Sequence, residues 1–155
     1  MIPQRILVAT DGSPAAKAAE SLAADIAGLM SASRPVEVVV VTAVHDAGNL
    51  SPETPGFIPK SAEFSEATVI SQQGADHVRE MLAQVPSGSQ VRVEAKVLEA
   101  MTPGGAIIAE AHAAGTCSLI IMGNRGHGGL AEALLGSVSQ DVVHRAHCPV
   151  MIARA

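Results

Sequence analysis

Short apolar runs alternate along this chain with segments of helical periodicity, and this alternation constrains the fold more than any other feature. The apolar runs predict strands at residues 6–9, 36–44, 118–122 and 150–153. Because most of these runs are apolar on both faces, they are typical of strands buried within a parallel sheet. Residues 91–97 instead alternate Val and Ala with charged residues, as expected for a strand that is wet on one face.

Helices are predicted between the strands. Ser13 supplies an N-cap and Pro14 a first helical residue, and further helices are predicted at 61–84, from Thr102 onward, and at 137–146. The first helix is expected to bury one stripe, formed by Ala15, Ala18, Ala19, Leu22, Ala23, Ile26, Leu29 and Met30. The resulting βαβαβαβαβ order predicts an α/β fold, an open parallel sheet with helices on both faces, as in Rossmann-like proteins.

Length and composition narrow the class of protein. The 155 residues fit one domain, 1–155, and 48% hydrophobic against 16% charged residues excludes disorder. A net charge of −5 does not attract a polyanion, and only two aromatic side chains, Phe57 and Phe64, are present for stacking on bases. We therefore expect no nucleic-acid partner.

The chain carries no signal for a membrane or for secretion. Its longest apolar run, Val38–Val44, is too short to cross a bilayer, and the apolar run at 6–9 lacks the length of a signal peptide. Cys117 and Cys148 form no C-x-x-C motif and are too few for a disulfide framework, so reduced thiols are expected. These features predict a cytoplasmic protein without a membrane partner.

The strongest chemical signal is a glycine-rich segment, residues 123–137, directly after the fourth predicted strand. Glycines let backbone N–H groups approach a ligand, and Gly136-Ser137 begins a helix whose amino end favours anions. The segment therefore predicts a phosphate cradle, with glycines that merely permit tight bends as the alternative. If the first and fourth strands are neighbours, Thr10-Asp11-Gly12 at the end of the first strand faces the same crevice.

Other nucleotide-binding motifs are absent from the sequence. No lysine occurs after Lys96, which excludes a P-loop within the glycine-rich segment. Residues 126–131 match a G-x-G-x-x-A pattern, but they follow the fourth predicted strand. A dinucleotide-binding fold carries this motif after its first strand.

The pattern Gly123-x2-Gly126-x9-Gly136-Ser137, with Ala9-Thr10-Asp11-Gly12-Ser13 at the first strand end, resembles the ATP-binding branch of the universal stress protein family. The likeness continues through Cys148-Pro149-Val150-Met151-Ile152 and so spans the chain. The resemblance implies five parallel strands in the order 3-2-1-4-5, with the first and fourth side by side.

The resemblance also implies an adenine-nucleotide site, with ATP as the expected ligand. Asp11 would face the ribose, phosphates or Mg²⁺, and the backbone of Ala43 would meet the adenine. The full set of expected binding residues is Thr10, Asp11, Ala43, Gly123, Arg125, Gly126, Gly136, Ser137, Val138 and Ser139. Because Arg125 is the only cation in the cradle segment, Mg²⁺ is expected to help neutralise the phosphates. From the residues alone, Asp11 could equally form an Asx turn and Arg125 could be a solvated loop residue.

The expected function is that of an adenine-nucleotide-binding regulator of the stress response, acting as a dimeric switch. A slow ATPase or an autophosphorylating protein using Ser137 or Ser139 is the main alternative, and a nucleotide-free dimeric adaptor is the third. Dimerisation is expected through the last strand, Val150, Met151, Ile152 and Ala153, because an uncharged edge strand needs a cover and a second copy supplies it.

Overall fold

The sheet has the predicted number of strands and the predicted order. The computed structural model describes residues 4–45, 60–86, 90–113, 119–126 and 135–155. Neighbouring strands run in the order β3-β2-β1-β4-β5, and every pair is parallel. The strands are β1 (Arg5–Ala9), β2 (Val36–His45), β3 (Val91–Ala100), β4 (Leu119–Gly123) and β5 (Val150–Ala153). β1 and β4 are therefore neighbours, which is the condition under which the turn after β1 and the glycine-rich segment face one crevice.

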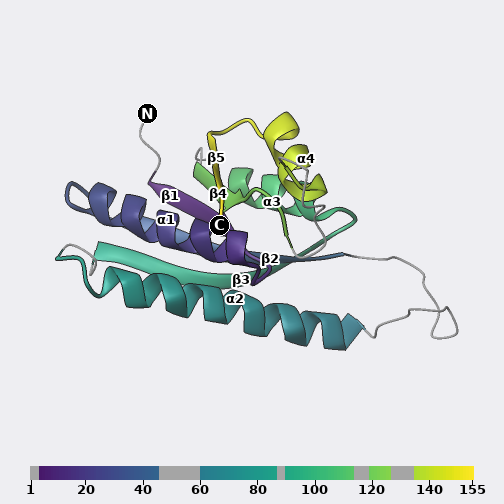
Figure 1. Cartoon of the computed structure of the whole chain (residues 1–155), viewed down its shortest axis with the longest axis horizontal. Coiled ribbons are helices and arrows are strands. Elements are labelled where there is room, and N and C mark those ends of the chain that lie inside the picture. Colours follow the sequence, from purple (N-terminus) through teal and green to yellow (C-terminus); the bar gives the residue numbers. More distant parts are fainter. Residues whose placement is uncertain (1–3, 46–59, 87–89, 114–118, 127–134) are drawn as a thin grey trace, which may run out of the picture.

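In the described parts of the chain, four helices cover both faces of this sheet, which confirms the predicted α/β fold. They are α1 (Pro14–Ser31), α2 (Lys60–Leu82), α3 (Pro103–His112) and α4 (Ser137–Arg145). α1 and α2 pack on one face and α3 and α4 on the other, each pair around its own apolar core (Figure 1). Among the described residues, none of the helices combines the length and the apolar character that a bilayer crossing requires.

α1 packs on the sheet through small residues. Ala19, Ala23 and Ala27 are fully buried, whereas Leu29 is 79% exposed. The expectation that Leu29 belongs to the buried stripe is therefore wrong. Leu29 projects from a different side of α1 than the three buried alanines. Because alanine side chains are short, the alanine face lets the α1 backbone lie close to the strands.

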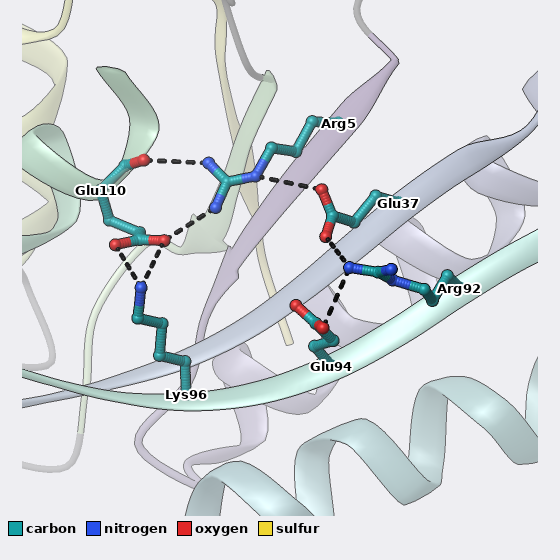
Figure 2. Close-up of polar contacts among 6 residues, drawn as sticks. All are labelled: Arg5, Glu37, Arg92, Glu94, Lys96 and Glu110. Carbon is teal, nitrogen blue, oxygen red and sulfur yellow. Dashed lines mark hydrogen bonds and ion pairs between the residues drawn. The ribbon is translucent and has the colours of Figure 1, made fainter. Parts of the chain in front are cut away.

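An ion-pair network at the amino ends of the strands fixes α3 to the sheet. Figure 2 shows its members, which are Arg5, Glu37, Arg92, Glu94, Lys96 and Glu110. Arg5 donates to the carbonyl oxygen of Glu110 at 2.9 Å and to its Oε1 at 2.7 Å, and Lys96 Nζ lies 3.0 Å from Oε2. Burial opposes ionisation of Glu110, but its hydrogen bonds and ion pairs with Lys96 and Arg5 outweigh burial and lower its pKa below 4.5. With the carboxyl end of α3 held here, its amino end is positioned at the opposite edge of the sheet.

Candidate functional site

A pocket of about 770 Å³ opens at the carboxyl ends of β1, β2 and β4, where the amino ends of α1, α3 and α4 also meet. Its volume lies within the range typical of small-molecule sites. The structure brings all ten sequence-predicted site residues to the wall of this one pocket: Thr10, Asp11, Ala43, Gly123, Arg125, Gly126, Gly136, Ser137, Val138 and Ser139. The strand-end crevice predicted from the sequence is therefore present.

The turn after β1 carries Asp11 to the pocket. Asp11 Oδ1 accepts a hydrogen bond from the N–H of Ser13 at 2.9 Å, which is an Asx turn. Gly12 has φ +78°, a left-handed conformation that glycine adopts without strain. Ser13 Oγ then accepts from the N–H of Ala16 at 3.2 Å and caps α1, as predicted. Asp11 therefore forms the Asx turn that the residues alone allowed, and it also lines the pocket.

The glycines at the end of β4 and beyond it serve two different purposes. A Cβ added at Gly123 would lie 2.8 Å from backbone and Cβ atoms of Ala15, so this glycine lets the first turn of α1 pack against the end of β4. A Cβ added at Gly126 would instead collide with the carboxylate of Asp11. One added at Gly136 would lie 3.2 Å from the Cα atom of Arg125. Gly123 therefore serves the packing of α1 against β4, while Gly126 keeps the pocket wall beside Asp11 free of a side chain.

The amino end of α4 differs from those of α1 and α3. Ser13 and Thr102 cap those two helices with their side-chain oxygens, whereas the N-cap of α4 is Gly136, and no side chain among the described residues caps this helix. Its first N–H groups, at Ser137 and Val138 on the pocket wall, therefore keep their capacity to bind an anion. The loop and helix are tied together, because the N–H of Gly136 donates to the carbonyl of Asn124 at 2.6 Å.

The charged groups of the pocket are of both signs. Arg125 is half-buried and lines it, and the Asp11 carboxylate lies beside Gly126 on the same pocket wall. In the part of the chain that the structure describes, no three His, Cys, Asp or Glu side chains gather into a metal site. Any Mg²⁺ at Asp11 would therefore need phosphate and water oxygens as its other ligands, which is how Mg²⁺ is commonly held.

Sequence reasoning missed the contribution of α3 to the pocket. Pro103 and Ile107 line it from this helix, and Gln140 lines it from α4. The signal was available, because the Thr102-Pro103 helix start must lie at the same edge as the other strand ends. Cys117 and residues 127–134 of the predicted glycine-rich segment lie outside the described residues.

Sequence comparisons agree with this architecture. The model of the universal stress protein family matches residues 3–154. The universal stress protein Rv2005c of Mycobacterium tuberculosis is 32% identical over 149 residues, which cover 96% of this chain and 45% of that protein, so the chain spans about half the length of this relative. The universal stress protein MJ0531 of Methanocaldococcus jannaschii is 31% identical over 154 residues, covering 97% of this chain and 82% of that protein.

Solved structures share the fold. The universal stress protein UspA of Lactobacillus plantarum superposes with a TM-score of 0.70 at 22% identity, covering 99% of this chain and 100% of that one. A universal stress protein solved in complex with cAMP gives 0.66 at 22% identity, with 97% and 96% covered. An Arabidopsis thaliana universal stress protein family protein with AMP bound gives 0.53 at 18% identity, with 98% and 92% covered. From the family match over nearly its whole length and from these relatives, the chain belongs to the universal stress protein family.

Proposed function

We propose that this protein binds an adenine nucleotide, with ATP as the expected ligand, in the pocket at the carboxyl ends of β1, β2 and β4, and acts as a nucleotide-dependent regulator of the stress response. The observation that carries the proposal is that the ten residues expected from the sequence and the family resemblance all line one pocket. Two proteins of the same fold have been solved with cAMP and with AMP, which supports an adenine nucleotide as the ligand class. Such a regulator would act in the cytoplasm, as expected from the sequence.

The walls of the pocket suit the two ends of a nucleotide. Val41, Ala43 and Ile107 offer aliphatic surface and backbone groups to a base, in a protein with very few aromatic side chains. At the other end, the uncapped N–H groups of α4 and the side chain of Arg125 would bind phosphates. Gly126 and Gly136 would let the phosphate chain approach the backbone, since neither adds a side chain there.

In this proposal Asp11 orients Mg²⁺ against the phosphates. Oδ1 of Asp11 is engaged by the N–H of Ser13, and the carboxylate borders Gly126, where the phosphates would lie. A bare triphosphate would meet this negative charge, whereas Mg²⁺ between the two would turn repulsion into attraction. We therefore expect binding of ATP to depend on Mg²⁺ more strongly than binding of AMP does.

We also propose that the protein works as a homodimer through β5 (Val150, Met151, Ile152, Ala153). β5 is an edge strand, and Met151 is 38% exposed on it. The carbonyl of Pro149 accepts from the N–H of Ile120 on β4, and that of Ala153 accepts from the N–H of Asn124 just after β4. The alternation of the strand therefore turns the backbone groups of Val150 and Ile152 outward. These outward groups would pair with the same strand of a second copy about a two-fold axis.

Autophosphorylation is the second candidate, and the two serines named for it differ sharply. Ser139 is 2% exposed, and its hydroxyl donates to the carbonyls of Asn124 at 2.7 Å and Gly136 at 3.1 Å. Ser137 is exposed and lines the pocket at the first residue of α4. A phosphoacceptor at this site would therefore be Ser137, with Ser139 holding the loop to the helix.

The test begins with mass spectrometry of small molecules released from purified, undialysed protein. Calorimetry then compares ATP, AMP and cAMP, each with and without Mg²⁺, and steady-state turnover separates a binding protein from a slow ATPase. Recovery of an adenine nucleotide, or its saturable binding, is expected. Absence of both in folded protein would favour the nucleotide-free adaptor instead.

A further inference from the structure

A buried carboxylate lies behind the pocket, outside the set of proposed ligand-binding residues. Glu20 on α1 is 3% exposed, yet both of its oxygens have partners. Oε1 accepts from the hydroxyl of Thr10 at 2.6 Å, and Oε2 lies 2.7 Å from Nδ1 of His77 on α2. Burial of a carboxylate is costly, and an apolar side chain of similar volume is often as stable, so stability alone does not explain this residue.

The Thr10 hydroxyl connects Glu20 to the turn that carries Asp11. Thr10 Oγ1 donates to Glu20 and accepts from the N–H of Gly12 at 3.2 Å, while the carbonyl of Thr10 accepts from the hydroxyl of Thr42 at 3.0 Å. With its proton directed to Glu20, the hydroxyl presents a lone pair to Gly12, the residue with positive φ. Glu20 therefore sets the orientation of the group that holds the turn.

α2 closes over this arrangement through three residues on one helical stripe. Ile70 lies beside Gly12, since a Cβ added at Gly12 would be 3.9 Å from Ile70 Cγ2. A Cβ added at Gly74 would be 2.9 Å from Oε1 of Glu20, so the helix backbone sits directly over the Glu20–Thr10 hydrogen bond. His77, one turn further on, holds the second oxygen. Spacings of four and three residues place all three on the same face of α2.

We propose that Glu20 is a positioning residue for the ligand site: it orients Thr10, which fixes the Asp11 turn, and His77 holds the Glu20 carboxylate in place from α2. The inference rests on the proposed function for its effect on binding. Its structural part, the dependence of the turn on Glu20, stands independently of any ligand.

Two variants, Glu20→Gln and Glu20→Leu, test whether the acceptor that Glu20 offers to the Thr10 hydroxyl is what matters. Gln keeps an acceptor for the Thr10 hydroxyl, so its affinity for Mg·ATP should stay within about twofold of the wild type. Leu removes the acceptor, and binding should weaken about tenfold, the size of effect that follows loss of a hydrogen bond to a charged group. Ser31→Ala is the matched control: Ser31 is a buried, hydrogen-bonded residue at the other end of α1, and its loss should leave the affinity unchanged.

A readout in the ligand-free protein separates failure of this inference from failure of the proposed function. Hydrogen exchange of the Gly12 amide should speed up about tenfold in Glu20→Leu and remain as in the wild type in Glu20→Gln and Ser31→Ala. If Glu20→Leu does not fold, hydrogen exchange of the Gly12 amide in ligand-free Thr10→Val and Thr10→Ser provides the same contrast, because only Ser keeps the hydroxyl. Unchanged exchange and affinity in the Leu or Val variant would overturn the inference, as would a Gln or Ser variant as impaired as its apolar counterpart.

Discussion

Replacing Gly126 by alanine should weaken nucleotide binding while leaving the fold intact. The new methyl group would collide with the Asp11 carboxylate, which is the end of a side chain and can move aside. Moving it would cost the hydrogen bond from Ser13, about 1 kcal/mol. A Gly→Ala change at a residue without positive φ recovers about 0.4–1 kcal/mol from the unfolded state. The two effects nearly cancel, so Tm should change by less than about 4 °C.

The effect on binding should be much larger. Displacement of the proposed Mg²⁺-orienting carboxylate, together with a methyl group at the phosphate position, should weaken Mg·ATP at least about tenfold, or about 1.4 kcal/mol. Calorimetry measures the affinity, and thermal unfolding of the ligand-free protein measures stability. Gly28→Ala is the control, since its methyl group would lie 3.2 Å from Val85 Cγ1 at the far end of α1. Wild-type affinity in a folded Gly126→Ala variant would refute the reasoning.

Three further predictions concern charge, acid stability and assembly. Asp11→Asn keeps an acceptor for the Ser13 N–H but removes the negative charge, so calorimetry should find weaker Mg·ATP binding at unchanged Tm. A lower Tm with unchanged affinity would mean that Asp11 serves only the turn. Because the folded-state pKa of Glu110 lies below 4.5, its pairing stabilises the fold at neutral pH and is lost as pH falls through that lowered value. Denaturant unfolding should therefore find Glu110→Gln less stable than the wild type at neutral pH but not in acid, and a pH-independent difference would contradict this. Ile152→Pro removes an outward-facing N–H donor of β5 and should give a folded monomer, as measured by light scattering. Met151→Pro should instead damage the pairing between β4 and β5. A fully dimeric Ile152→Pro variant would exclude this interface.

The elements and the α/β class could be predicted from the apolar patterns, whereas the strand order was implied by the family resemblance. β2 is apolar on both faces and lies inside the sheet, and the alternating charges of β3 lie on an edge strand. The starts of α1, α3 and α4 were predicted from local signals at Ser13, Thr102 and Gly136. Local patterns of this kind depend on nearest neighbours and are therefore readable in one sequence.

The errors and omissions involve contacts between distant segments. Leu29 fits a helical stripe, but the sheet selects the neighbouring alanine face, which the helix alone cannot indicate. Glu20 resembles a solvated charge in the sequence, because its partners Thr10 and His77 are 10 and 57 residues away. The role of Gly123 likewise depends on the approach of Ala15 from α1. Such contacts are fixed by packing rather than by local pattern.

The central claim, that an adenine nucleotide binds at the carboxyl edge of the sheet, is tested most directly by following backbone amide resonances during titration with Mg·ATP. Saturable shifts are predicted for Gly126, Ser137 and Val138, with smaller ones at Gly12. The amides of Arg5 and Arg92, in the ion-pair network at the opposite edge, should not move. Shifts centred on that network, or no shifts at millimolar ATP, would contradict the account.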